Sequence, residues 1–266
     1  MKLRILLPPA FLLLGCASFG EDFTLITVGE EWELGEALAR DLEGGIRLIE
    51  DPEVAAYAAA LGETLLAQAR GDHPAVAARP WTFRVVDDPS IHAFTLPGGR
   101  VYLHAGLVER AEAYPEILAA VAHQVAHGLL RHGAENLTRR FGISLLTEML
   151  SGREPAVYRT VLEEAAAGGP LFRFDEDAER EADRLGIAYV YRAGVDPLGT
   201  VFLLRRLEDL DPASSGLLER FVAAHPLTRD RIEDVRKHVR SLPPKELRTE
   251  DPGLAAFREA VLRAAS

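Results

Sequence analysis

The chain has 266 residues, of which 48% are hydrophobic and 27% charged, a composition typical of a globular protein with one large buried core. The formal net charge of -11 and the lack of any basic run argue against a nucleic-acid-binding protein. The only cysteine is Cys16, which excludes an internal disulfide.

The chain begins with "MKLRILLPPAFLLLGCAS", in which Lys2 and Arg4 precede an apolar run to Leu14. This run is too short to span a bilayer and is typical of a secretory signal. Its end, "LLGC", resembles the lipobox of bacterial lipoproteins, in which cleavage precedes the cysteine and the thiol is acylated. The alternative is an ordinary signal peptide with a chance cysteine. We expect residues 1–15 to be a lipoprotein signal peptide, residues 16–30 to comprise lipidated Cys16 and a tether, and residues 31–266 to form the domain.

Hydrophobic periodicity predicts the elements that follow. Residues 30–69 should form two helices, because apolar residues recur there at helical spacing. Aromatic and β-branched residues predict strands at 81–86 and 101–104, separated by turns. The predicted fold class is therefore α+β, mostly α, with a small β-sheet. Further helices are predicted at 115–133, 134–171 (one or two), 175–197, 197–221, 228–241 and 253–264.

The segment 117–130 is apolar except for His123, Gln124 and His127 and one glycine, so its helix should be buried. Histidines four residues apart lie on one helical face, where both rings can reach one metal ion. The alternative is two core histidines with backbone or carboxylate partners. Buried imidazoles need strong partners, and zinc is a good one.

A third ligand could come from "DAEREADRLG", where Glu179 and Asp183 are also four residues apart. One carboxylate could bind the metal while the other accepts the free ring N–H of a ligating histidine. Alternatively, the segment is a charged helix face paired with its own arginines. His132 is excluded as a ligand, because on a continuous helix it lies about 180° from His123.

Four blocks in succession resemble the zinc metallopeptidases of the BepA, LoiP, HtpX and Oma type, peptidase family M48. "IHAFTLPGGRVYLHAGLV" is similar to the family's strand–turn–strand before the active-site helix, and "AAVAHQVAHGLLRHG" to its HExxH helix. "EREADRLG" resembles its ExxAD block, and "AAHPLTRDRI" its His-Pro segment ending in arginine. The resemblance spans about residues 30–240 and implies a zincin-like domain with the sheet beside the active-site helix.

The resemblance also assigns roles to individual residues. It implies that His123, His127 and Glu179 bind one Zn²⁺ per chain, with Asp183 as the partner of a ligating histidine. His225 would be a switchable fourth ligand or a donor to the oxyanion.

The same resemblance places a substrate cleft beside the sheet. The strand around Val101 would be the sheet edge that pairs with an unfolded or extended polypeptide. The cleft residues would be His92, Ala93, Val101 and Tyr102, and His92 stands where the family usually has asparagine.

Gln124 is the main departure from the family, because it replaces the glutamate of HExxH. Glutamine can still accept a hydrogen bond from a metal-bound water, but it cannot take up a proton. Its presence therefore predicts a site that binds zinc and whose hydrolysis is reduced by at least roughly 10²–10⁴-fold. The substitution is either natural or introduced.

The predicted protein is a lipoprotein of the cell envelope, in the outer membrane and facing the periplasm, that takes part in proteolytic quality control. The alternative is a non-catalytic relative that serves as a chaperone or scaffold.

Overall fold

A computed structural model describes residues 24–151, 160, 173–208, 225 and 229–265. It is mostly helical with a small sheet, as predicted. The helices are α1 (Val28–Glu43), α2 (Pro52–Ala69), α3 (Pro74–Ala77), α4 (Ala105–Arg110), α5 (Tyr114–Leu129), α6 (His132–Ser151), α8 (Glu176–Arg192), α9 (Leu198–Glu208), α11 (Arg229–Ser241) and α12 (Leu254–Ala264). The strands are β1 (Thr82–Val86), β2 (Ala93–Leu96) and β3 (Arg100–His104).

The folded domain begins earlier than residue 31, where the sequence placed its start. Ile26 is buried, and Thr27 caps α1 in a capping box with Glu30. These contacts make residues 24–30 part of the domain rather than a tether. Cys16 lies outside the described residues.

The sheet has the order β1-β3-β2, and β2 was not predicted from residue patterns. β3 pairs in parallel with β1 and antiparallel with β2, so it is the central strand. The prediction that the strand around Val101 is the sheet edge is therefore wrong, because β3 is paired with a strand on each side. Val101 and Tyr102 are both fully buried, which also excludes them from a substrate surface.

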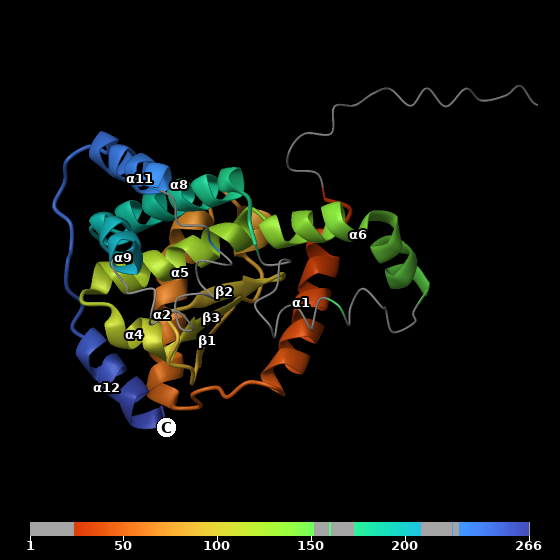
Figure 1. Ribbon diagram of the computed structural model, residues 1–266, viewed down its shortest axis with the longest axis horizontal. Coiled ribbons are helices and arrows are strands. Elements are labelled where there is room, and N and C mark those ends of the chain that lie inside the picture. Colours follow the sequence, from red (N-terminus) through yellow and green to blue (C-terminus); the bar gives the residue numbers. More distant parts are fainter. Residues whose placement is uncertain (1–23, 152–159, 161–172, 209–224, 226–228, 266) are drawn as a thin grey trace, which may run out of the picture.

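Alternate residues of β3 belong to two cores, as expected for a strand covered on both faces. Val101 and Leu103 join the main core, which includes residues of α2, α5 and α9. Tyr102 joins a smaller core with Leu38 and Leu42 of α1. Figure 1 shows α5 between the sheet and the pair α8 and α9, so α5 is the buried central helix.

Close packing of α8 on α5 depends on Gly186. A Cβ atom at this position would lie 3.2 Å from the Ala122 carbonyl carbon and 3.3 Å from the His123 nitrogen. A side chain here would push the two helices apart. The glycine therefore lets the acidic face of α8 approach the histidines of α5.

Candidate metal centre

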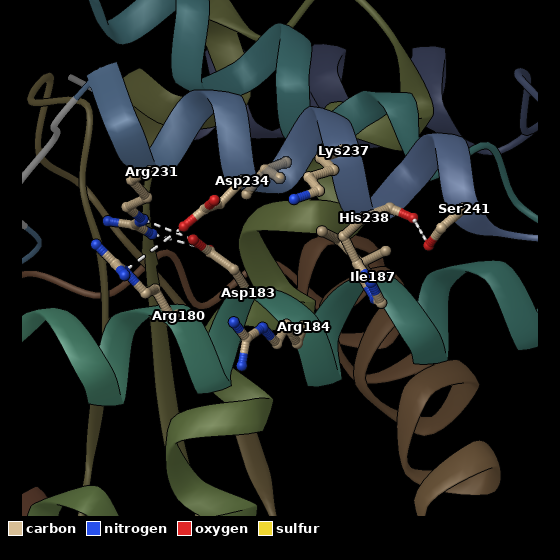
Figure 2. Close-up of a pocket in the computed structure, with 10 residues that line it drawn as sticks. Arg180, Asp183, Arg184, Ile187, Arg231, Asp234, Lys237, His238 and Ser241 are labelled. Atoms are coloured by element: carbon tan, nitrogen blue, oxygen red, sulfur yellow. Dashed lines mark hydrogen bonds and ion pairs between the residues drawn. The ribbon is translucent and has the colours of Figure 1, made fainter.

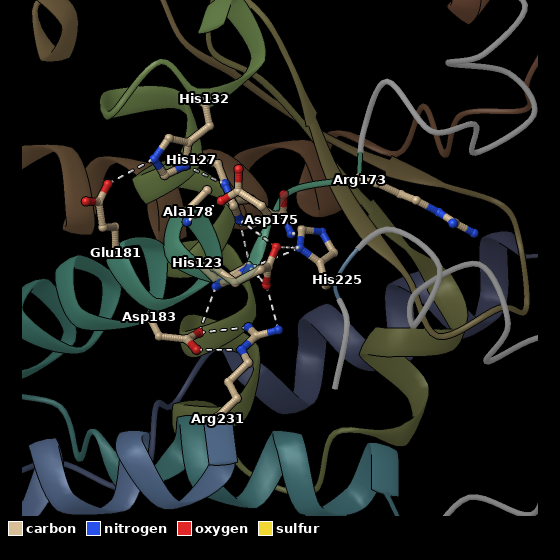
Figure 3. A network of polar contacts seen from close by, with 12 residues as sticks. His123, His127, His132, Arg173, Asp175, Ala178, Glu181, Asp183, His225 and Arg231 are labelled. Carbon is tan, nitrogen blue, oxygen red and sulfur yellow. Dashed lines mark hydrogen bonds and ion pairs between the residues drawn. The ribbon is translucent and has the colours of Figure 1, made fainter. Parts of the chain in front are cut away.

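All residues of α5 are buried, and the helix presents His123 and His127 on one face. Their Nε2 atoms are 3.0 Å apart. The two rings meet nearly edge to face, with centroids 4.6 Å apart. The predicted spacing thus brings two imidazole nitrogens to one point inside the protein (Figure 3).

Glu179 reaches the same point from the first turn of α8. Its Oε1 lies 3.3 Å from His127 Nε2, and its Oε2 lies 3.4 Å from His123 Nε2. Asp175 caps this helix by accepting a hydrogen bond from the Ala178 backbone N–H. The cap fixes the start of α8, and with it the turn that carries Glu179.

His225 completes the cluster from a third part of the chain. Its Nδ1 lies 2.7 Å from Glu179 Oε1 and 3.1 Å from His123 Nε2. One donor atom from each of His123, His127, Glu179 and His225 lies within 4.8 Å of all the others. All four side chains are buried.

The spacing of these donors fits a tetrahedral zinc ion. Zinc–nitrogen bonds of about 2.0–2.1 Å give ligand–ligand separations of about 3.3 Å. The closer contacts between donor atoms of the cluster are 2.7 to 3.4 Å long, and all four donors lie within 4.8 Å of one another. Two histidines and a glutamate are also a common donor set of catalytic zinc. The residues present therefore fit the metal that the family resemblance implies.

Asp183 and Arg231 support the cluster from behind. Asp183 Oδ1 lies 3.0 Å from His123 Nδ1, the ring nitrogen that faces away from the cluster. Arg231 contacts Asp183 through Nε and Nη2 at 2.6 and 2.9 Å, and Glu179 Oε2 through Nη1 at 2.5 Å. Burial would raise the pKa of Asp183, but Arg231 outweighs burial and holds the pKa at about 2. Arg231 was not among the predicted site residues, although two buried carboxylates on one helix face require a cation.

His132 is not in the cluster, but the reason given from the sequence was wrong. α5 ends at Leu129, and Arg131 adopts a left-handed backbone with φ 62°. The chain therefore bends back and brings His132 Nδ1 to 2.8 Å from His127 Nδ1. His132 Nε2 in turn lies 3.4 Å from Glu181 Oε2. His132 is thus a partner of His127 on the side away from the cluster.

The protonation equilibria of the histidines differ. Burial lowers the pKa of His127 well below its usual range, and the neighbouring His123 adds to this. Burial also lowers the pKa of His225, although Glu179 opposes it. Burial acts in the same direction on His123, but the Glu179 and Asp183 carboxylates outweigh it and raise its pKa. The centre therefore favours the neutral form of His127 and His225 and favours positive charge at His123, where a metal cation can replace the proton.

Gln124 lies beside the cluster and is 1% exposed. Its Nε2 is 3.2 Å from His225 Nε2. Its Oε1 is buried and has no hydrogen-bond partner in the described part of the chain. The side chain therefore has one amide atom available for a water or a substrate at the cluster.

The predicted cleft residues are divided by the fold. Ala93 lies on the edge strand β2, which packs against α5. His92 immediately precedes β2, is buried, and stacks on Phe94 with ring centroids 5.4 Å apart. Neither residue is a member of the metal cluster. The edge nearest the site is therefore β2 rather than the strand around Val101.

No helix among the described residues has both the length and the apolar character that a bilayer-spanning segment requires.

Comparison with known proteins identifies relatives for most of the chain. The family model "Peptidase family M48" matches residues 54–239. The chain is 28% identical over 243 residues to the beta-barrel assembly-enhancing protease of Escherichia coli K12, covering 88% of this chain and 49% of that protein. It is 30% identical over 231 residues to a putative protease of the same name from Vibrio cholerae, covering 84% and 46%. It is 28% identical over 157 residues to the mitochondrial metalloendopeptidase OMA1 of Schizosaccharomyces pombe, covering 59% and 46%. The chain thus spans about half the length of these relatives.

Proposed function

Because the chain belongs to peptidase family M48, we propose that it is a zinc metalloendopeptidase-type lipoprotein of the bacterial cell envelope. It acts in quality control of misfolded or unassembled envelope proteins, with hydrolysis strongly impaired by Gln124. The observation that carries this proposal is the buried cluster of His123, His127, Glu179 and His225. In this proposal one Zn²⁺ per chain is held by His123, His127 and Glu179.

The metal, when bound, lowers the pKa of a water and polarises the scissile carbonyl. The residue at position 124 lies beside the cluster. A glutamate there would take up the water's proton and pass it to the leaving amine. Gln124 can orient the water through Oε1, but it has no group that titrates near neutral pH. The chain therefore retains the means to bind metal and lacks the usual means to move the proton.

We assign the fourth corner of the cluster to His225. Its Nδ1 already lies at ligand–ligand distance from Glu179 and His123. A histidine in this corner occupies the position that a catalytic zinc leaves open for water. His225 would then be a switchable ligand, and its departure would free a position for water or substrate.

The substrate is an extended polypeptide that adds to the edge of β2. Main-chain hydrogen bonds to a sheet edge give affinity with little sequence specificity, which suits unfolded proteins. The proposed substrate edge is therefore β2 and not the strand around Val101. Of the predicted cleft residues, Ala93 remains in the proposal because it lies on β2.

The location rests on Cys16 and on the relatives. A lipid on Cys16 would hold the protein on the periplasmic face of the outer membrane, where a protease named for β-barrel assembly would meet its substrates. Cys16→Ser should release the protein from membrane fractions, and association that survives the change would contradict the anchor.

A second candidate is a non-catalytic zinc protein that serves as a chaperone or scaffold. The observation that favours it is Gln124, since the metal cluster is otherwise complete.

Two measurements on the purified chain test these proposals. Metal analysis should give about one zinc per chain, and His127→Ala should abolish it, because one of three ligands is lost. Digestion of an unfolded substrate by Gln124→Glu should exceed that by the unsubstituted chain roughly 10²–10⁴-fold. Absence of zinc would contradict the metal centre. Equal digestion by both forms would contradict the role of position 124, and no digestion by either would favour the scaffold.

A further inference from the structure

A cavity of about 270 Å³ lies between α8 and α11, behind the metal centre. Figure 2 shows its residues projecting from both helices. Ile187 and Val235 give it an apolar floor, and the Asp183–Arg231 pair forms one end. The same Arg231 that holds Glu179 therefore also borders this cavity.

The ionised side chains that line the cavity carry an excess of positive charge. Asp183 is neutralised by Arg231, and Arg180 lies 3.7 Å from Asp234. The remaining two cations, Arg184 and Lys237, form no ion pair with any residue for which the structure gives a position. A net positive cavity in a chain of formal charge -11 is not explained by the general surface composition.

His238 offers a further hydrogen bond to a ligand. It lines the cavity, and its Nε2 is buried without a hydrogen-bond partner in the described ranges. Ser241 also lines the cavity, but its hydroxyl already donates to the His238 carbonyl at 2.7 Å. A buried polar atom without a partner is costly, and a bound polar ligand would remove that cost.

We propose that this cavity binds a phosphate ester, with the phosphate at Arg184, Lys237 and His238 and the organic part against Ile187 and Val235. Guanidinium and ammonium groups are the usual binders of phosphate oxygens. The apolar floor favours an ester over inorganic phosphate. The same chemistry is found in soluble phosphate esters and in the headgroups of anionic lipids.

The test is calorimetric titration of the full chain with glycerol 3-phosphate. A variant carrying Arg184→Gln and Lys237→Gln removes the two cations, both of which are exposed and outside the metal cluster. The matched control carries Arg79→Gln and Lys245→Gln, which remove one exposed arginine and one exposed lysine elsewhere. Repeating the titration on His127→Ala excludes phosphate bound to metal, so failure here is distinct from failure of the proposed function.

We expect saturable binding by the unsubstituted chain and the control, weakened at least tenfold in the cavity variant, because each charged hydrogen bond is worth about a factor of ten. Cosedimentation with vesicles of phosphatidylcholine and phosphatidic acid, lost in the same variant, would identify a lipid headgroup. Binding of glycerol 3-phosphate without such cosedimentation would identify a soluble ester. Absence of saturable binding of both probes, or equal binding by the cavity variant, would overturn the proposal.

Discussion

The two halves of the candidate centre are supported very differently. In the metal-binding half (His123, His127 and Glu179), each residue has a further polar partner: His123 forms an ion pair with Asp183, His127 a hydrogen bond with His132, and Glu179 an ion pair with Arg231. In the other half (Gln124 and His225), Gln124 contacts His225 through one amide atom, and its Oε1 has no partner in the described ranges. This difference indicates that the proposed metal binding is supported by several contacts, whereas the proposed proton transfer depends on a single side chain. One substitution can therefore remove the chemistry and leave the metal site intact.

The largest loss of folding free energy is expected from replacing Arg231, which contacts both Glu179 and Asp183. Arg231→Met leaves the buried Glu179 and Asp183 carboxylates without their shared guanidinium. Removing one partner of a buried ion pair costs about 3–5 kcal/mol of folding free energy. We expect a loss of this size in urea unfolding of the metal-free protein. Arg180→Met is the control, because Arg180 pairs with partly exposed Glu176 and Asp234 and should cost less than about 1 kcal/mol. Equal losses in the two variants would show that the metal-binding half has no special support.

The next prediction concerns the contact between His132 and His127 in the metal-binding half. His132→Phe keeps the ring size and removes the nitrogen that lies 2.8 Å from His127. Loss of such an outer partner typically lowers metal affinity about 10–100-fold. Competition with a chelator should show this fall, and His132→Gln should restore part of it by keeping a polar atom. His73→Phe, at a half-buried histidine outside the metal cluster, should leave zinc affinity unchanged. An unchanged zinc affinity in His132→Phe would show that His132 contributes only to packing.

A third prediction concerns His225, which belongs to the other half of the centre. In the Gln124→Glu background, His225→Ala should open the fourth corner of the cluster to water. We expect hydrolysis to rise on the order of tenfold, because the competent form is no longer limited by departure of the histidine. Zinc should remain bound, since three ligands are kept. A fall in hydrolysis of about 10²–10³-fold would instead make His225 an oxyanion donor and contradict the assignment.

The sequence predicted the parts of this centre that depend on local periodicity. The spacing of His123 and His127, and that of Glu179 and Asp183, places each pair on one face of a helix whatever the rest of the fold does. Most helices were predicted for the same reason.

The parts that were missed depend on tertiary structure. β2 is only four residues long, too short for a periodic signal, and only the family resemblance implied a strand there. Neither the pattern nor the resemblance gave the strand order that makes β3 the central strand. The position of His132 follows from the left-handed backbone of Arg131, which lies just beyond the end of α5, whereas the predicted helix continued to residue 133. Arg231 belongs to a helix about 50 residues from Glu179, and no local pattern connects the two.

The smallest expected effect tests whether the support of Glu179 is redundant. Asp175→Ala removes the N-cap of α8, which should cost about 1 kcal/mol of folding free energy. Zinc affinity should change little, because Arg231 still holds the Glu179 carboxylate. The hydrogen bond from the Ala178 backbone N–H lowers the pKa of Asp175 in the folded state. Its contribution is therefore present above the carboxyl's unfolded pKa and is lost as the pH falls through the lowered folded value.

The difference in unfolding free energy between the unsubstituted chain and Asp175→Ala should shrink in acid for that reason. Asp175→Asn is the matched control, because its amide oxygen can still accept the hydrogen bond but does not titrate. Its small loss should arise from the charge alone and disappear over the same acid range. If Asp175→Ala instead lowered zinc affinity as much as His132→Phe does, Glu179 would depend on the helix terminus as well as on Arg231. The metal-binding half would then be less redundant than its contacts indicate.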